Sequence, residues 1–422
     1  MTFYKETEFR ETTIGKIPKE WDVKETEELG EVVTGITPST FVKEYWNGDY
    51  PFVTPTDMTN GKYVEKTERK VTAKGLEKGR LIPKDSVLVT CIASIGKMAL
   101  AFEDCLTNQQ INAIICKEGV NPHYVYYALG FRTPTLKSWA GQTTNPIIKK
   151  SLFEKFPISL PRNEPEQQNI AEVLSTVDLA IQKTDNVIWK TERLKKGLMQ
   201  TLLTKGIGHT EYKDTPIGKI PSEWQVLALQ GICQVTDGSH WSPKEVEKSN
   251  YKIATVANLK ETHIDIDSCK SISEEDYKRL VKEGDVPEKG DILFSKDGTV
   301  GISFAFKQHG NNIGLLSSIA IIRPDQTVLF PEFGSYAIKS PNVFWQVIGW
   351  KTGTALRRIT LEHLKTIKIP IPSFSEQQKI AEILSTVDKK LELEKKEKAR
   401  LERIKRGLMD LLLTGRIRVK VD

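Results

Sequence analysis

The chain has 422 residues, which is enough for about two to three domains, each with a core of its own. Its 61 Lys and Arg against 55 Asp and Glu leave a net charge of +6; this excess excludes a histone-like protein or a basic tail, so any nucleic-acid surface must be local. Hydrophobic residues at 39% and charged residues at 27% exclude wholesale disorder. The sequence has no apolar run of roughly 18 residues and no secretory signal, so we expect a cytoplasmic protein with no membrane segment.

The first block in chain order, Thr7–Val23, returns in the second half of the chain. TEFRETTIGKIPKEWDV matches TEYKDTPIGKIPSEWQV, which starts at Thr210, at 11 of 17 positions. EQQNIAEVLSTVD, from Glu166, matches EQQKIAEILSTVD, from Glu376, at 11 of 13 positions. A later stretch, RLKKGLMQTLLTKGI, returns as RIKRGLMDLLLTGRI. The chain is therefore two copies of one unit of about 210 residues.

Short β-branched and aromatic segments between Gly and Pro residues predict strands in both copies. The predicted strands are Pro51–Pro55, Ser86–Cys91, Ile111–Cys116, Tyr251–Val256, Asp291–Ser295 and Ser318–Ile322. Asn121-Pro122 and Pro331-Glu332 predict helix starts. Although Asn-Pro-His-Tyr at 121–124 is similar to the Asn-Pro-Pro-Tyr motif of adenine methyltransferases, His123 breaks that motif, and no Gly-rich cofactor loop accompanies it.

Between the matched blocks the two copies diverge. GITPSTFVKEYWNGDYPFVTPTDM, from Gly35, has no visible counterpart in TDGSHWSPKEVEKSNYKIATVANL, from Thr236. Only faint similarities persist, as between Val87–Gly96 and Ile292–Gly301. A matched framework with unmatched loops is the pattern expected of a protein that holds two different ligands in one fixed geometry.

A long helix is predicted after each mixed α and β domain. Asn163 or Ser375 can cap it, with Glu166 or Gln378 three residues later closing a capping box. Apolar residues then recur at helical spacing for about 38 to 40 residues, or roughly 60 Å. Helices of this length cannot bury their apolar stripes against one small domain, so we expect the two to pair as a coiled coil.

Topology favours an antiparallel pair, because only about ten residues separate the first helix from the second domain. The predicted fold class is α+β, with two similar mixed α/β domains separated by two long antiparallel helices in a pseudo-twofold repeat. The first domain is predicted at 1–156, the first helix region at 157–208, the second domain at 209–367 and the second helix region at 368–422. Residues 389–420 hold 12 Lys or Arg and 5 Asp or Glu, a basic stretch that can serve DNA or an acidic partner surface.

Taken together, these motifs resemble the specificity subunit of type I restriction-modification systems. The matching features are IGKIPxEW at the start of each half, GITPST with YWNGDYPFVTPTDM, TDGSHWSP, EQQxIAExLSTVD and the GLMxxLLT helix end. The resemblance implies two target-recognition domains that each recognise one part of a split, asymmetric double-stranded DNA site, with the helices as a ruler between them. It also implies docking of two methyltransferase subunits, with endonuclease subunits added for cleavage.

The resemblance further implies that this chain is not an enzyme and carries no cofactor of its own. S-adenosylmethionine, Mg²⁺ and ATP are then expected only on the other subunits. The sequence itself contains no Walker A motif. The alternative from another class is a coiled-coil scaffold whose end domains bind proteins, and binding that is insensitive to salt and to competitor DNA would favour it.

Candidate DNA-binding residues are polar, basic or aromatic side chains on the predicted loops, since such groups can contact base edges or phosphates. In the first domain they are Thr37, Ser39, Thr40, Tyr45, Trp46, Thr90, Ser94, Lys97, Gln142, Thr143, Thr144, Asn145, Lys149 and Lys150. In the second domain they are Asp237, Ser239, His240, Trp241, Ser295, Lys296, Asp297, Thr299, Lys351, Thr352, Thr354, Arg357 and Arg358. The alternative is a solvated loop or, for Trp46 and Trp241, a core anchor. We expect Lys149, Lys150, Arg357 and Arg358 to touch phosphate rather than bases.

Three further expectations concern packing and partners. Trp21 and Trp224, in the repeated opening block, are expected to anchor the chain as it enters each domain. Leu198, Met199, Leu408 and Met409 form a candidate docking patch for the methyltransferase subunits, with ordinary helix-helix core as the open alternative. The five cysteines are scattered, so we expect reduced, mostly buried thiols, and no metal site is predicted.

Overall fold

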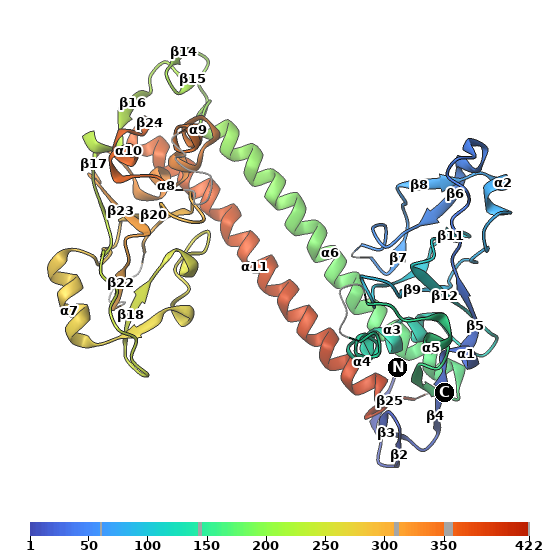
Figure 1. Ribbon diagram of the computed structural model, residues 1–422. Coiled ribbons are helices and arrows are strands. Elements are labelled where there is room, and N and C mark those ends of the chain that lie inside the picture. Colours follow the sequence, from blue (N-terminus) through green and yellow to red (C-terminus); the bar gives the residue numbers. More distant parts are fainter. Residues whose placement is uncertain (60, 142–145, 308–311, 350–357, 421–422) are drawn as a thin grey trace. The chain divides into compact units, whose positions relative to one another are not determined.

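The computed structural model describes residues 1–59, 61–141, 146–307, 312–349 and 358–420 (Figure 1). The chain forms two compact units. Unit 1 is Met1–Asn186 with Lys395–Asp422, and unit 2 is Val187–Glu394. Each of the two long helices, α6 (Glu164–Leu202) and α11 (Phe374–Leu413), therefore begins in one unit and ends in the other.

Unit 1 is built on a five-stranded sheet and a three-stranded sheet. The first has the order β5 (Gly30–Thr34), β12 (Ile111–Cys116), β9 (Val87–Thr90), β10 (Met98–Ala101), β7 (Tyr63–Val64), and the second has the order β11 (Leu106–Thr107), β6 (Trp46–Val53), β8 (Arg69–Val71). The two-stranded pairs are β1 (Phe3–Lys5) with β25 (Ile417–Val419), β2 (Phe9–Thr12) with β3 (Gly15–Pro18), and β4 (Trp21–Glu25) with β13 (Pro157–Pro161). The short helices are α1 (Thr26–Leu29), α2 (Ala73–Leu76), α3 (Pro122–Phe131), α4 (Thr133–Trp139), α5 (Lys150–Glu154) and the 3-10 turn η1 (Lys43–Tyr45).

Unit 2 repeats this plan. Its larger sheet has the order β17 (Cys233–Asp237), β23 (Ile319–Pro324), β20 (Ile292–Ser295), β21 (Ser303–Ala305), and its smaller sheet has the order β19 (Lys270–Ile272), β18 (Tyr251–Ala254), β22 (Ile313–Leu315). The two-stranded pairs are β14 (Tyr212–Thr215) with β15 (Gly218–Pro221), and β16 (Gln225–Ala228) with β24 (Lys368–Ile371). The helices are α7 (Glu274–Glu283), α8 (Pro331–Lys339), α9 (Pro341–Gly349) and α10 (Leu361–Thr366), with 3-10 turns η2 (Leu229–Gly231), η3 (Val256–Asn258) and η4 (Ile266–Ser268).

The strands and helix starts predicted from the sequence are confirmed, with small shifts at their ends. Strand β6 begins earlier than predicted, at Trp46, and β23 extends to Pro324. Helix α3 begins after Asn121, whose Oδ1 accepts the backbone N–H groups of His123 and Tyr124. The Asn-Pro-His-Tyr stretch is therefore an ordinary N-cap, as its broken motif predicts.

The caps of the long helices differ in part from the prediction. Helix α11 begins at Phe374, so Ser375 lies inside its first turn, and Ser373 Oγ instead accepts the Glu376 N–H at 3.4 Å. Asn163 accepts the N–H of Gln167 through its carbonyl oxygen. The predicted capping box at Glu166 is wrong, because that carboxylate bonds side chains of unit 1 instead.

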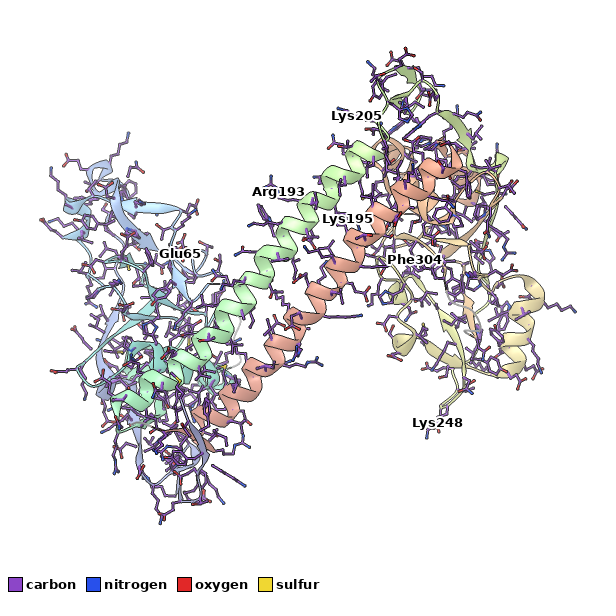
Figure 2. The ribbon with its side chains drawn as sticks, turned by 180° about the vertical axis from the view of Figure 1, so that it is seen from behind. Glu65, Arg193, Lys195, Lys205, Lys248 and Phe304 are labelled. Carbon is purple, nitrogen blue, oxygen red and sulfur yellow. The ribbon has the colours of Figure 1, made fainter. Side chains whose placement is uncertain are left out.

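Within each unit, segments of the two long helices pair antiparallel, as predicted (Figure 1). In unit 1, Lys405 Nζ lies 2.6 Å from Asp178 Oδ1, and Lys398 Nζ lies 2.6 Å from Asp185 Oδ1. Moving seven residues forward on α6 thus corresponds to moving seven residues back on α11. In unit 2, Lys195 Nζ lies 2.5 Å from Asp388 Oδ1, and Figure 2 shows Lys195 on the side of α6 that faces α11.

Apolar burial along the two helices is uneven. Ile170, Leu174, Ile380 and Leu384 are fully buried against the unit cores. Leu194 is 54% exposed, although the sequence pattern assigns it to the buried stripe. The ion pairs between the helices occupy part of the seam that a pure coiled coil fills with apolar side chains.

The cysteine side chains are mostly buried, as predicted. All five cysteines are free, and only Cys116 among them is partly exposed. Burial raises the pKa of the Cys91 and Cys105 thiols to about 12. In the described part of the chain, no helix combines the length and the apolar character that a bilayer span requires.

Candidate nucleic-acid interface

In unit 1, the hairpin between β9 and β10 is closed by a hydroxyl group. Thr90 Oγ1 donates to the carbonyl oxygen of Ser94 and accepts the N–H of Lys97 at 2.9 Å. Residues Ala93 and Gly96 adopt positive φ angles of 59° and 83°. Because Ala rarely adopts this conformation, the surrounding hydrogen bonds must hold the backbone of the hairpin in place.

Other loops of unit 1 meet this hairpin at the same end of the five-stranded sheet. The N–H of Cys91 donates to Gln110 O at 2.8 Å, and the N–H of Ile148 donates to Cys91 O at 2.8 Å. Thr37 Oγ1 donates to Gln109 Oε1 at 2.7 Å. Three segments distant in sequence, the loop after β5, the hairpin and the segment before α5, thus converge at one sheet end.

Unit 2 repeats this arrangement with different side chains. Ser295 Oγ donates to Thr299 O at 2.6 Å and accepts the N–H of Ile302 at 2.8 Å. The left-handed positions recur at Gly298 (φ 66°) and Gly301 (φ 106°). The hairpins after β9 and β20 therefore share one backbone, which explains the faint sequence similarity between them.

The segment before α10 meets the hairpin of unit 2 in the same way. The N–H of Ile359 donates to Lys296 O at 2.9 Å, and the N–H of Lys296 donates to Ser318 O at 3.0 Å. The loop after β17 joins them, since the N–H of Ser317 donates to Ser239 O at 2.8 Å. The structure thus brings together the candidate residues of unit 2 that come from the loops after β17 and β20.

The structure separates the predicted DNA-binding residues by exposure. Nine are exposed: Ser39, Thr40, Ser94, Lys97, Lys149, Lys150, His240, Thr299 and Arg358. Five are partly exposed: Thr37, Tyr45, Asp237, Trp241 and Asp297. Eight lie outside the described residues: Gln142, Thr143, Thr144, Asn145, Lys351, Thr352, Thr354 and Arg357.

Five candidates are buried in this structure, and their contact with DNA stays a prediction: Trp46, Thr90, Ser239, Ser295 and Lys296. Thr90 and Ser295 close the hairpins from inside. Trp46 is a core anchor, because its indole N–H donates to Ser39 O at 3.1 Å and its ring packs on Phe52. The sequence pattern did not separate these residues, since hydroxyl and indole groups serve loop closure as well as base contact.

Lys296 belongs to a charged network inside unit 2. Its Nζ lies 3.2 Å from Asp237 Oδ2 and 3.5 Å from Asp297 Oδ2. Asp297 also bonds Arg358, at 3.0 Å, and Asp237 lies 3.4 Å from the exposed His240. A buried lysine needs such carboxylate partners, so Arg358 and His240 are left as the side chains of this network that can reach a ligand.

Trp241 anchors its loop to α7. Its Nε1 donates to Glu283 Oε2 at 2.8 Å, and the Arg279 guanidinium lies 4.1 Å from the ring centroid. The core-anchor alternative therefore also accounts for Trp241.

The blocks repeated between the two copies hold the helices onto the domains. Trp21 Nε1 donates to Glu166 Oε2 at 3.3 Å, and Trp224 Nε1 donates to Glu376 Oε2 at 3.0 Å. Both tryptophans are buried, at 0% and 1% exposure. The prediction that Trp21 and Trp224 anchor the chain is confirmed.

Sequence reasoning missed a second repeated cluster, in which an aspartate of each STVD block bonds a tyrosine and a lysine. Tyr127 Oη donates to Asp178 Oδ2 at 2.7 Å, and Tyr336 Oη donates to Asp388 Oδ2 at 2.7 Å. The lysines are Lys405 and Lys195, each from the other long helix. Burial and the adjacent carboxylate raise the pKa of both tyrosines well above the ordinary value. The identical Asp and Lys of the repeated blocks were the signal available in the sequence.

The four candidate docking residues are all partly buried. Leu198 and Met199 pack against the core of unit 2, and Leu408 and Met409 pack against the core of unit 1. Their helix-core role is thus observed, and their role in docking stays a prediction.

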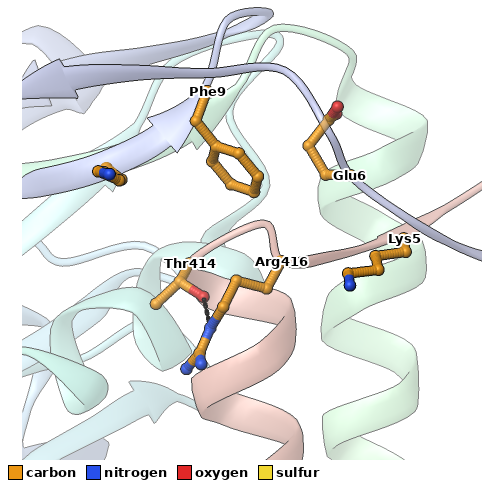
Figure 3. A pocket seen from close by; sticks show the side chains of 6 residues that line it. Lys5, Glu6, Phe9, Thr414 and Arg416 are labelled. Carbon is orange, nitrogen blue, oxygen red and sulfur yellow. Dashed lines mark hydrogen bonds between the residues drawn. The ribbon is translucent and has the colours of Figure 1, made fainter.

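A shallow pocket of about 380 Å³ lies beside the paired terminal strands β1 and β25 (Figure 3). Lys5, Phe9 and Lys16 line it from the N-terminal side, and Thr414 and Arg416 line it from the C-terminal side. Arg416 Nε donates to Thr414 Oγ1 at 3.2 Å. The described residues include no cluster of His, Cys, Asp and Glu suited to a metal ion.

Comparison with known proteins identifies the family. A family model described as the type I restriction modification DNA specificity domain matches residues 18–188 and 221–403. The MjaIX specificity subunit of a type I restriction enzyme from Methanocaldococcus jannaschii is 32% identical, over 98% of this chain and 98% of that protein. The MjaVIII specificity subunit from the same organism is 28% identical, over 100% of this chain and 98% of that protein.

Solved structures agree in fold. The S subunit of a type I restriction-modification system from M. genitalium has a TM-score of 0.62 at 18% identity, covering 93% of this chain and 96% of that one. The resemblance drawn from the repeated motifs is confirmed. The chain therefore belongs to the family of type I restriction-modification DNA specificity proteins, with one specificity domain in each of its two copies.

Proposed function

We propose that this chain is the non-catalytic DNA-recognition subunit of a type I restriction-modification complex, and that each domain recognises one half of a bipartite, asymmetric DNA site. One observation carries the proposal: the same backbone framework occurs twice and presents different side chains at equivalent positions. The recognition domains are proposed at 1–156 and 209–367, and the helix regions at 157–208 and 368–422.

The difference between the two domains is sharpest where the loops converge. Cys91 and Lys296 follow equivalent strands, but Cys91 accepts a hydrogen bond from Asn112 Nδ2 at 3.2 Å, whereas Lys296 pairs with two carboxylates. Lys97 is exposed on the first hairpin, and Arg358 is exposed beside the second. Two loop sets with different donors and charges suit two different base sequences.

The paired helices are proposed to set the spacing between the half-sites. The ion pairs of Lys405 with Asp178 and of Lys195 with Asp388 hold one antiparallel register at both ends of the helices. A helix of 39 residues spans roughly 60 Å. Since B-DNA rises about 3.4 Å per base pair, this length can hold two half-sites more than one helical turn apart.

The same helices are proposed to dock two methyltransferase subunits, to which endonuclease subunits are added for cleavage. The candidate docking residues Leu198 and Met199 occupy positions equivalent to those of Leu408 and Met409, and all four are partly exposed. Two equivalent apolar pairs suit two identical subunits. S-adenosylmethionine, Mg²⁺ and ATP are assigned to those subunits, and the complex is placed in the cytoplasm.

The test is selection of bound duplexes from a random-sequence library, with the chain alone and with its methyltransferase subunits. The expected result is a split motif with two unlike halves and a fixed gap. Recovery of no split motif in either case contradicts the proposal. Binding that is insensitive to salt and to competitor DNA also contradicts it and favours a protein-binding scaffold.

A further inference from the structure

The loop of unit 1 between β5 and η1 carries an aromatic side chain in full contact with solvent. Phe41 is 96% exposed, the largest exposed fraction among the exposed large hydrophobic residues of the described chain. Ile36 and Val42 of the same loop are 39% and 37% exposed. A ligand that covers the Phe41 ring removes a large apolar surface from water and so gains binding free energy.

This loop is held in a defined conformation at both ends. At its start, the backbone packs so closely at Gly35 that a Cβ atom would lie 2.2 Å from Thr107 Oγ1. At its end, the Trp46 indole N–H donates to Ser39 O at 3.1 Å, and the N–H of Val42 donates to the same oxygen at 3.4 Å. Phe41 therefore stands in a turn whose backbone is held by a buried tryptophan, so the position from which its ring projects is pre-organised.

The surroundings of Phe41 favour nucleic acid over an apolar protein partner. Ser39 and Thr40 precede it, and the exposed Lys43 follows it. The nearest acidic residue in sequence, Glu44, is paired with Lys74 at 2.9 Å. The bond between Thr37 and Gln109 ties this loop to the sheet end where the hairpin after β9 also lies. The hydroxyl groups and the lysine can contact phosphates, and the exposed ring between them can contact a base.

We propose that Phe41 inserts its ring at a base-pair step in the half-site recognised by the first domain and stacks on a base there. This inference rests on the proposed DNA-recognition function and adds a residue that positions the DNA. The equivalent loop of unit 2 has Trp241 turned onto α7. The insertion is therefore confined to one half-site, which adds to the asymmetry of the complete site.

The experiment uses the full chain in complex with its methyltransferase subunits and duplexes that carry the selected split motif. The base analogue 2-aminopurine, whose fluorescence rises when it is unstacked, replaces each purine of the first half-site in turn. The expected result is a fluorescence rise on binding at one step, at a position other than the methylated base. The variant Phe41→Ala is expected to lose that rise and to bind the specific duplex roughly tenfold more weakly.

Two variants serve as controls. Phe102→Ala removes a ring that is 48% exposed after β10, at the end of the strand away from the hairpin, and is expected to keep the rise. Phe41→Leu is expected to retain part of it, because a large aliphatic side chain can also wedge between base pairs. If the complex binds the split motif but Phe41→Ala leaves every signal unchanged, the inference is overturned while the recognition function stands. If Phe41→Ala instead weakens assembly with the methyltransferase subunits and leaves the fluorescence unchanged, the inference is overturned in favour of a protein contact.

Discussion

Glu166 and Glu376 lie in the first turns of the two long helices, and each accepts a hydrogen bond from the indole of a repeated opening block. Their remaining partners differ. Arg418 bonds Glu166 in unit 1, with Nη2 2.8 Å from Oε2, whereas His209 bonds Glu376 in unit 2, with Nε2 3.0 Å from Oε1. A buried carboxylate needs a hydrogen-bond donor in both copies, so the two copies keep the acid and change the residue that bonds it.

Substitution of Arg418 is expected to destabilise unit 1 strongly. Its guanidinium bonds Glu6, Glu20 and Glu166 and is only 6% exposed. Arg418→Met leaves these carboxylates without their cation, at a cost of about 3–5 kcal/mol. Hydrogen exchange in the paired strands β1 and β25 measures the effect. The exposed Arg416 provides the control, since Arg416→Met is expected to cost about 1 kcal/mol or less, and equal effects of the two substitutions contradict the prediction.

The stability of unit 1 is expected to depend on Lys62 between pH 8 and 10.5. Burial lowers the pKa of Lys62 to about 8 from 10.5, opposed by Asp178 and Asp85 and aided by Lys405. Between these values the unfolded chain binds more protons than the folded one, so the contribution of Lys62 to the free energy of unfolding rises with pH. The stability of Lys62→Met relative to the original chain is therefore expected to fall from pH 8 to pH 10.5. Denaturant titrations measure the effect, with Lys70→Met at an exposed position as the matched control.

At the scale of secondary-structure elements, the two long helices combine buried apolar ends with charged pairs. Part of the basic stretch at 389–420 is neutralised inside unit 1, where Lys398 and Lys405 bond aspartates of α6. These pairs fix which residues of the helices face each other, because a shift of one residue would separate the charges. Polar groups at helix seams specify register in the same way in coiled coils.

Exchange of one charge pair is expected to test this register. Lys405→Asp places a second carboxylate beside the partly buried Asp178, so unit 1 should lose about 1–3 kcal/mol of unfolding free energy. Adding Asp178→Lys restores opposite charges and should recover part of the loss. A double-mutant cycle by denaturant unfolding measures the coupling, and losses that are simply additive would refute a direct interaction.

Lengthening both helices together is expected to change only the half-site spacing. Seven residues inserted after Asn186 in α6 and seven inserted after Glu394 in α11 leave the ion pairs of each unit intact. Each helix gains about 10 Å, or roughly three base pairs of DNA. Library selection with the lengthened complex should recover both half-sites with a wider gap, and an unchanged gap contradicts the spacer role. Insertion in α6 alone is the matched control, because it breaks the register.

At the scale of the whole molecule, the duplication supplies what the proposed recognition of two different half-sites requires, namely one framework with two sets of loops. The framework bonds, such as Trp21 with Glu166 and Trp224 with Glu376, are the same in both units. The loops that converge at the sheet ends are not. Substitutions can therefore change the loops of one unit without disturbing the other unit.

Replacement of one domain is expected to change one half-site only. A chimera in which residues 26–156 come from a relative keeps the opening block, the EQQ block and the second domain. Methylation mapping in a host that expresses the complete system should show a new first half-site, an unchanged second half-site and an unchanged gap. A change in both halves would show that the two domains do not recognise DNA independently.

The sequence alone determined the duplication, the family, six central strands of the larger and smaller sheets and the two long helices, because these depend on local pattern and on self-similarity. Helical spacing and the Asn121 cap act within a few residues, and the repeated blocks are visible in the letters themselves. Even so, the predicted cap at Ser375 was wrong by two residues, since both Ser373 and Ser375 carry a hydroxyl group that can serve as a cap.

Only the tertiary structure decided which candidate side chains are available to a ligand. Thr90 and Ser295 are hidden in hairpins, Lys296 is buried between two aspartates, and Phe41 is exposed on a turn held by Trp46. The pairing of β1 with β25 joins the two ends of the chain in unit 1. Each of these outcomes depends on contacts between segments far apart in sequence, and neither residue type nor periodicity encodes which distant segment will cover a given side chain.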